Sequence, residues 1–291
     1  MSTIEIKSVV VDSGISVFYR TASPPNNPAA PIVLLLHGFP TSSFQYRNLI
    51  PLLSPHYRVV APDLPGFGFT TVPAERNYTY TFAEMAITIG AFLDALDIRS
   101  FAVYIFDYGA PVLLRLALQR PEAITAIVSQ NGNAYAEGLG GAWAPIQKYW
   151  ASGSAEDRKG VLDGVFTYEA TKWQYTHGSR APDAIAPETY TLDWALLQRP
   201  RMFDVQLDIF KDYATNVELY PQFQEYFRKS QVPLLAVWGR NDLFFVPAGA
   251  EAYKRDLPNA EVVLLDAGHF AGETETAEVG ALILKFLERV L

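Results

Sequence analysis

The sequence predicts an α/β protein in which helices cover both faces of a mostly parallel β-sheet and a helical segment interrupts that sheet. Short apolar, β-branched runs alternate with helix-like segments over residues 1–132. No strand-like run occurs over residues 133–230, where aromatic residues and Gln are frequent, and the alternation returns over residues 231–291. A chain of 291 residues can form one core with an insertion, so we expect two core segments and an inserted helical cap at 133–230.

Strands are expected where an apolar run is too short for a helix. Those of the first core segment are predicted at 4–11, 15–19, 32–36, 57–61, 101–106 and 124–129, and those of the second at 233–238 and 262–265. The later runs are apolar on both faces, which is typical of parallel strands buried between two layers of helices. The covering helices are predicted at 82–96, 112–119, 248–256 and 279–290.

The composition limits the classes of partner. The formal charge is −8 and no cluster of Lys and Arg occurs, which argues against nucleic-acid binding. No apolar run approaches the roughly 18 to 20 residues that cross a membrane, and residues 1–7 do not resemble a secretory signal. The absence of cysteine excludes disulfides and thiolate chemistry. We therefore expect a soluble, cytoplasmic protein whose partners are water and a small, mainly apolar molecule.

Polar residues at the carboxyl ends of the strands are the candidates for chemistry, because open α/β sheets place their sites there. The run at 101–106 ends in Asp107 and passes at once into a helix, whose first turn tolerates Pro111. A carboxylate at that sharp turn lies near the positive end of the helix and near backbone donors, and both keep it ionised. Asp107 is therefore a candidate nucleophile, although an aspartate after a strand is also a common helix cap.

Two further strand ends carry an acid and a histidine. Asp242 follows the run at 233–238, and His269 follows the run at 262–265. Taken singly, Asp242 is an ordinary turn residue and His269 an ordinary polar loop residue. Nucleophile, acid and histidine nevertheless follow one another in an order known from catalytic triads on α/β sheets, each at a different strand end. Their joint occurrence predicts a triad of Asp107, Asp242 and His269.

Five motifs occur at these strand ends and in the neighbouring loops. They are His37-Gly38-Phe39-Pro40, Pro62-Asp63-Leu64-Pro65-Gly66-Phe67-Gly68, the Asp107 turn, Trp238-Gly239-Arg240-Asn241-Asp242 and Gly268-His269-Phe270. Together they resemble the epoxide hydrolase and haloalkane dehalogenase branch of the α/β-hydrolase superfamily. The resemblance covers residues 30–132 and 232–291, is weaker in the cap, and implies the α/β-hydrolase fold with an aspartate nucleophile.

The resemblance implies a reaction in two steps. Asp107 attacks an electrophilic carbon to form an alkyl-enzyme ester, and His269, oriented by Asp242, activates the water that hydrolyses this ester. The backbone N–H groups of Phe39 and Tyr108 are expected to bind the oxyanion of the second step. A serine mechanism is disfavoured because no Gly-x-Ser-x-Gly occurs. No cofactor and no metal are expected, since the four histidines show no paired ligand spacing.

Several positions depart from the family pattern. Ile105 takes a position that is normally small, so we expect different packing at the nucleophile turn. Phe106, often polar in relatives, is expected to make the floor of the pocket drier. Some dehalogenases carry the acid after the strand at 124–129, but Gln130 and Asn131 there have no charge, which favours Asp242 as the partner of His269.

The leaving group decides the substrate class. An epoxide leaves an alkoxide, which needs a proton donor, and tyrosine phenols of the cap can supply the proton. The segment 208–216 resembles the stretch that bears a ring-opening tyrosine in epoxide hydrolases, with Tyr213 at the matching place, and Tyr149 is the candidate for the second. Packing of the cap is the alternative role for both, since the chain has 16 tyrosines. His37, Trp150 and Phe106 are expected to line the substrate pocket.

Epoxide hydrolysis to a vicinal diol is the expected reaction, and two alternatives stay open. A dehalogenase has the same triad, but the side chains of Phe39 and Tyr108 lack the N–H with which haloalkane dehalogenases bind halide. Trp150 with Tyr213 is similar to the halide pocket of fluoroacetate dehalogenases, yet the arginines that hold a carboxylate there are absent. A non-catalytic, ligand-binding homologue would lack a triad member, and none is missing.

Overall fold

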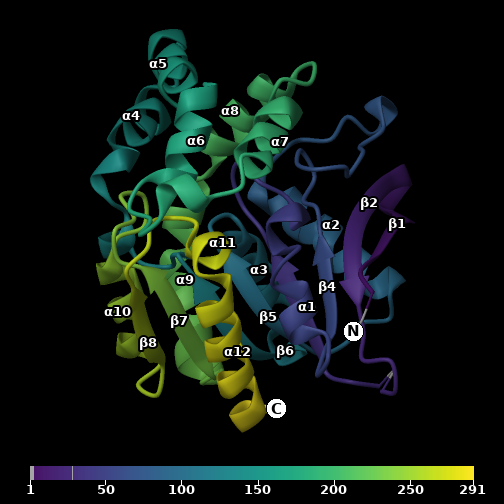
Figure 1. Cartoon of the computed structure of the whole chain (residues 1–291). Helices are drawn as coiled ribbons and strands as arrows, with labels where there is room; N and C mark the ends of the chain where they lie inside the picture. Colours follow the sequence, from purple (N-terminus) through teal and green to yellow (C-terminus); the bar gives the residue numbers. More distant parts are fainter. Residues whose placement is uncertain (1–2, 28) are drawn as a thin grey trace.

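The computed structural model describes residues 3–27 and 29–291 and has one eight-stranded sheet at its centre (Figure 1). The strands lie close to the predicted runs and are β1 Glu5–Val11, β2 Ile15–Ala22, β3 Ile32–Leu36, β4 Arg58–Pro62, β5 Phe101–Phe106, β6 Ile124–Gln130, β7 Leu234–Gly239 and β8 Glu261–Leu265. Their order is β1-β2-β4-β3-β5-β6-β7-β8. Strands β3 to β8 are parallel, and β1 and β2 are antiparallel at one edge, so the predicted mostly parallel sheet is confirmed.

Two apolar cores, one on each face, hold the helices against the sheet. Side chains alternate along β3, so that Leu34 and Leu36 belong to one core and Val33 and Leu35 to the other. The first core is covered by α2 Phe82–Ala95, α3 Gly109–Gln119 and α10 Pro247–Asp256, and the second by α1 Ile50–Leu53, α11 Ala271–Thr274 and α12 Thr276–Val290. Coverage on both faces explains why β5 and β7 are buried along their whole length.

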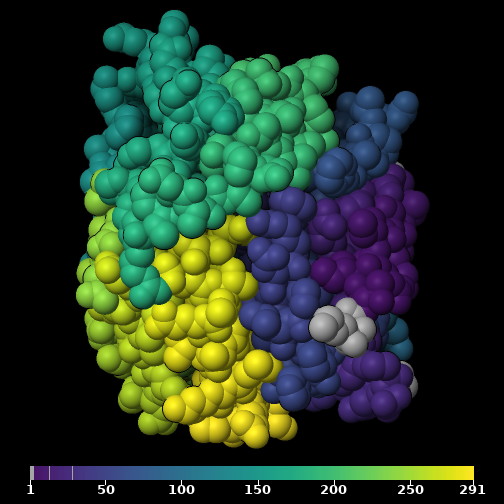
Figure 2. All heavy atoms as spheres, in the orientation of Figure 1, coloured from purple at the N-terminus to yellow at the C-terminus, as the bar shows by residue number. Residues whose placement is uncertain are grey.

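The chain between β6 and β7 is helical, as the sequence predicts. Its helices are α4 Ala144–Ser152, α5 Ala155–Val165, α6 Tyr168–Thr176, α7 Glu188–Leu197, α8 Met202–Asp212 and α9 Ala214–Ser230. Helices α4 to α8 lie together beyond one end of the sheet, and their side chains form a continuous layer there (Figures 1 and 2). Helix α9 instead packs against α3 and α10. The boundaries of the cap at 133 and 230 stay a prediction.

Candidate active site

Asp107 lies at the sharp turn between β5 and α3, at the carboxyl end of a central strand. Its φ is +47°, a left-handed conformation that non-glycine residues keep only where the surrounding structure enforces it. Gly109 makes the turn possible, because a Cβ there would lie 2.3 Å from the carbonyl oxygen of Leu36 on β3. The close contact between the turn and β3 therefore fixes the position of the Asp107 side chain.

We expect Gly109→Ala to lower the free energy of unfolding by about 3 kcal/mol or more, because the added methyl group meets backbone that cannot rotate away. Gly160→Ala is the matched control, since a Cβ at Gly160, within α5, meets no atom within 4 Å. The control is expected to raise the free energy of unfolding by about 0.5–1 kcal/mol. Urea unfolding measures the stability of both variants. Equal urea midpoints for Gly109→Ala and Gly160→Ala would contradict the close contact between the turn and β3.

The large side chain at position 105 is accommodated by small neighbours. Ile105 is fully buried. A Cβ on Gly132, two residues after β6, would lie 3.3 Å from Ile105 Cγ1 and 3.1 Å from the Cβ of Ala110. Gly132 and Ala110 therefore leave the space that Ile105 fills, which gives a physical reason for the departure from the family pattern at this turn.

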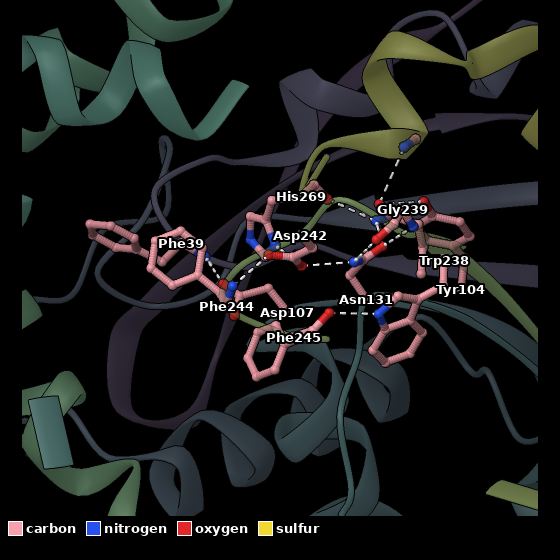
Figure 3. Close-up of polar contacts among 12 residues, drawn as sticks. Phe39, Tyr104, Asp107, Asn131, Trp238, Gly239, Asp242, Phe244, Phe245 and His269 are labelled. Atoms are coloured by element: carbon pink, nitrogen blue, oxygen red, sulfur yellow. Dashed lines mark hydrogen bonds and ion pairs between the residues drawn. The ribbon is translucent and has the colours of Figure 1, made fainter. Parts of the chain in front are cut away.

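Two backbone N–H groups surround the Asp107 carboxylate. The N–H of Phe39 donates to Asp107 Oδ2 at 2.6 Å (Figure 3). The N–H of Tyr108 also hydrogen-bonds this carboxylate. Gly38 allows the loop after β3 to approach, because a Cβ there would lie 2.4 Å from Asp107 Oδ2. The structure thus brings together the two residues that the sequence predicts for the oxyanion site.

His269 and Asp242 form a hydrogen-bonded pair on the loops after β8 and β7. His269 Nδ1 lies 2.8 Å from Asp242 Oδ2, and the N–H of Phe244 donates to Asp242 Oδ1 at 2.7 Å (Figure 3). A carboxylate beside Nδ1 favours the tautomer in which Nε2 can accept a proton. The imidazole lines the same cavity as Asp107, so the three residues of the predicted triad meet at one place.

Asn131, which the sequence offers only as an uncharged residue at the alternative position of the acid, hydrogen-bonds Asp242. Its Nδ2 donates to Asp242 Oδ2 at 2.7 Å, and its Oδ1 accepts the N–H of Gly239 at 2.9 Å (Figure 3). Its φ is +47°, a conformation that asparagine adopts more readily than most residues. The polar residue after β6 therefore serves as a donor to the acid that follows β7, and its place at a strand end is the one sign of this role in the sequence.

We expect Asn131→Gly to lower kcat about tenfold with little change in KM, because Asp242 loses a charge-assisted hydrogen bond and holds His269 less firmly. Glycine adopts the left-handed backbone readily, so the effect comes from the lost side chain. Asn77→Gly is the matched control, since the exposed Asn77 has the same φ of +47°. Steady-state kinetics compare the variants, and an equal loss in both would contradict the positioning role.

The backbone donors at the turn are expected to keep Asp107 ionised, but burial opposes them. Desolvation raises the pKa of Asp107 to about 7, although His269 and the two N–H donors act in the opposite direction. Burial alone would lower the pKa of His269, but the adjacent Asp242 carboxylate outweighs it and raises that pKa. The expected chemistry needs both groups deprotonated, Asp107 for the attack on carbon and His269 for the activation of water.

We expect activity to fall as the pH falls through about 7. Because the pKa of Asp107 is raised to about 7, the ionised nucleophile becomes scarce below that pH. The raised pKa of His269 acts in the same direction, since an imidazolium cannot accept a proton from water. One pH unit below the midpoint, kcat/KM should be about tenfold lower than its plateau at high pH. A profile that stays flat from pH 5.5 to 9 would contradict these protonation states.

A small cavity between the core and the cap holds the reactive groups. Its volume is about 20 Å³, enough for one water molecule. It is lined by Phe39, Asp107, Tyr108, Trp143, Val165, Gln174, Phe210, Phe244, Phe245 and His269. Trp143 and Gln174 are cap residues that no sequence motif singles out, because their approach depends on how the cap helices pack on the core.

His37 and Phe106, which the sequence predicts for the pocket, are not among the residues that line this cavity. His37 Nε2 accepts the N–H of Leu64 at 2.9 Å and thereby fixes the loop after β4. Phe106 packs against His269 and Phe270, with ring centres 4.8 and 5.0 Å apart. Phe106 therefore packs on the imidazole, and its apolar ring contributes to the apolar surroundings of His269.

Trp150 and Tyr149 of α4 also lie outside the lining of the cavity. The indole N–H of Trp150 donates to the carbonyl oxygen of Phe210 at 2.7 Å, so this donor is already used within the protein. Tyr149 is buried, and the ammonium group of Lys211 lies 6.0 Å from the centre of its ring. The structure therefore does not bring Trp150 into the pocket or Tyr149 to the reacting groups.

Tyr213 is buried beside the cavity but does not line it. Its hydroxyl lies 3.3 Å from that of Tyr220, which in turn accepts an N–H of Asn133 at 3.2 Å. The ring centres of Tyr213 and Trp143 are 4.4 Å apart, and Trp143 does line the cavity. The hydroxyl predicted to open an epoxide is thus engaged with another side chain.

Metal ligands and membrane spans were sought among residues 3–27 and 29–291. No group of three or more His, Cys, Asp or Glu side chains in these ranges is placed to hold a metal ion. In the same part of the chain, no helix combines the length and the apolar composition that a membrane crossing requires.

The parallel sheet thus carries an acid, Asp242, and a histidine, His269, after the adjacent strands β7 and β8. A sequence model described as alpha/beta hydrolase fold matches residues 31–276, which include strands β3 to β8 and the cap. The chain therefore belongs to the α/β-hydrolase family.

Three relatives of the chain are named as hydrolases of different kinds. An uncharacterized hydrolase of Saccharomyces cerevisiae, YNR064C, is 47% identical over 95% of this chain and 94% of its own length. Epoxide hydrolase 3 of Siraitia grosvenorii is 28% identical over 89% of this chain and 92% of its own length. A haloalkane dehalogenase of Mesorhizobium japonicum is 38% identical, but over 40% of this chain and 35% of its own length. The protein is accordingly a hydrolase of the α/β fold.

Proposed function

We propose that the protein hydrolyses epoxides to vicinal diols through an alkyl ester on Asp107. The observation that supports this most directly is the placement of the carboxylate. One of its oxygens accepts the N–H of Phe39 at 2.6 Å, and the side chain faces a cavity that it shares with His269. A carboxylate held in this way is preorganised to attack a carbon atom in the cavity.

The same groups support both steps of the proposed reaction. Asp107 attacks an epoxide carbon, and the bond from that carbon to the epoxide oxygen breaks. His269 then takes a proton from water, which attacks the acyl carbon of the ester, while Asp242 stabilises the imidazolium. The N–H groups of Phe39 and Tyr108 hold the oxyanion, and such a donor contributes about 3 kcal/mol in other enzymes.

The lining of the cavity favours an uncharged substrate. Seven of its ten residues are aromatic or aliphatic, namely Phe39, Tyr108, Trp143, Val165, Phe210, Phe244 and Phe245, and no Lys or Arg is among the ten. A halo-acid would therefore bring a carboxylate next to Asp107 without a cation to balance it. An epoxide carries no charge and suits this surrounding.

Hydrolysis of a carbon–halogen bond is the second candidate function, because a haloalkane dehalogenase is similar to part of this chain. Its similarity covers 40% of this chain. The epoxide hydrolase relative is similar over 89% of the chain, a share that must include most of the cap. The extent of the similarity therefore favours the epoxide.

The test uses water labelled with ¹⁸O and protein in excess over substrate, so that each molecule turns over once. Panels of terminal epoxides, haloalkanes and halo-acids are supplied, and diol and halide are measured. We expect unlabelled diol from epoxides and one ¹⁸O atom in the peptide that contains Asp107, because water attacks the acyl carbon. Label in the diol would contradict the ester. Halide release without diol would favour the second candidate, and no product from any panel would contradict both and favour a non-catalytic homologue.

A further inference from the structure

Two residues that line the cavity carry a buried hydrogen-bond donor with no partner among the described residues. These donors are the indole Nε1 of Trp143 and the hydroxyl of Tyr108, on side chains that are 2% and 1% exposed. Both residues line the cavity that holds Asp107. Buried donors are nearly always paired in proteins, so two unpaired donors at one cavity indicate a group that they bind when the site is occupied.

Two other indoles of the chain show what is unusual about Trp143. Trp150 donates to the carbonyl oxygen of Phe210 at 2.7 Å, and Trp238 donates to that of Phe245 at 2.6 Å. An indole can donate one hydrogen bond and accepts none through its nitrogen. Trp143 has no such carbonyl among the described residues, although it is almost fully buried, so its N–H is without a partner in the unliganded protein.

The two donors come from different parts of the chain. Tyr108 directly follows the nucleophile at the start of α3, whereas Trp143 ends the short turn Gly141–Trp143 that leads into α4 of the cap. When a carboxylate attacks carbon, negative charge develops on the leaving atom. Donors fixed beforehand in a water-poor cavity stabilise such charge more than donors in bulk water do.

We propose that Trp143 and Tyr108 bind the epoxide oxygen that leaves carbon as Asp107 attacks, an inference that rests on the function proposed above. An Asp107 oxygen forms a bond to carbon, the epoxide C–O bond breaks, and its electron pair stays on the leaving oxygen. Tyr108 transfers its hydroxyl proton to that oxygen, while Trp143 donates a hydrogen bond and keeps its proton. Hydrolysis of the ester regenerates the carboxylate and releases one proton through His269, which restores the Tyr108 hydroxyl.

This inference gives Tyr108 the role that the sequence predicts for Tyr213. The Tyr213 hydroxyl lies 3.3 Å from that of Tyr220 and is not part of the cavity lining. Its ring packs against that of Trp143, with centres 4.4 Å apart. Tyr213 is therefore a positioning residue, which holds the indole of Trp143 against the cavity.

The experiment measures ester formation alone, in His269→Gln protein, where hydrolysis of the ester is blocked. The probe is 1,2-epoxybutane, and the adduct is followed over time by intact mass. Trp143→Phe and Tyr108→Phe, each added to His269→Gln, are expected to slow ester formation about 10-fold and about 100-fold. The matched controls Trp194→Phe and Tyr226→Phe change rings that do not line the cavity and should leave the rate unchanged.

A further variant separates a lost donor from a packing defect. Trp143→His keeps a ring N–H and is expected to recover part of the rate that Trp143→Phe loses. If the variants at Trp143 do not fold, Tyr108→Phe, which removes a single oxygen atom, still tests the inference.

Ester formation that is as fast in Trp143→Phe and Tyr108→Phe as in the controls overturns the inference. The inference is also overturned if only Tyr213→Phe slows ester formation. That result would make Tyr213, the residue predicted from the sequence, the proton donor to the epoxide oxygen. If folded His269→Gln protein forms no ester at all, the proposed function itself fails, and that result is seen before any donor variant is compared.

Discussion

Asp107→Asn is expected to lower kcat/KM for the epoxide at least about 10⁴-fold, because a poorly nucleophilic amide replaces the attacking carboxylate. The amide keeps one oxygen that can accept the N–H of Phe39, so the surroundings of the side chain are preserved. Intact mass verifies that the asparagine has not been hydrolysed. Turnover above this level in the verified variant would contradict the role of Asp107 as nucleophile.

The same variant is expected to be more stable than the parent protein at pH 8. Burial raises the pKa of Asp107 from 3.8 to about 7, so the folded state holds this proton more tightly than the unfolded state does. The carboxylate therefore destabilises the fold increasingly as the pH rises from about 4 to about 7, and asparagine carries no such charge. Thermal unfolding should show that Asp107→Asn raises the melting temperature more at pH 8 than at pH 5. A melting temperature below that of the parent protein at pH 8 would contradict a destabilising charge on Asp107.

His269→Gln is expected to lower kcat about 10³-fold or more, while one substrate adduct accumulates per protein molecule. Glutamine cannot take a proton from water, whereas the attack by Asp107 on carbon does not use the imidazole. Removing the imidazole also removes a charge that lowers the pKa of Asp107, so trapping should work best above pH 8. Intact mass detects the adduct, and the mass gained identifies the bound group.

The matched control for this trap is His56→Gln, because His56 is exposed on the loop before β4. It is expected to turn over normally and to accumulate no adduct. Loss of turnover in His269→Gln without any adduct would show that ester formation also needs the imidazole. That result would contradict the proposal that His269 acts only in the hydrolysis of the ester.

The core could be predicted because its signals are local. The run at 101–106 is apolar on both faces, Asp107 follows it directly, and Pro111 lies in the first turn of the next helix, as in the structure. Each of these features depends on neighbours in the sequence and on the rule that strand ends carry the site. The turn that carries Asp107 could therefore be located without knowledge of any distant contact.

The inner surface of the cap could not be predicted in the same way. Trp143 and Trp150 are seven residues apart in similar aromatic surroundings, and their roles differ because Trp150 meets a carbonyl 60 residues further along the chain. Asn131 has its partner Asp242 at a separation of 111 residues. Contacts of this kind arise when helices and loops that are distant in the sequence pack together. Neighbouring residues in the sequence do not indicate them.

The cavity between the core and the cap has room for about one water molecule. A substrate that reaches Asp107 must therefore push apart lining side chains such as Phe210 and Trp143. For the reaction proposed above, the entry of the epoxide and the departure of the diol would both depend on this motion of the cap against the core.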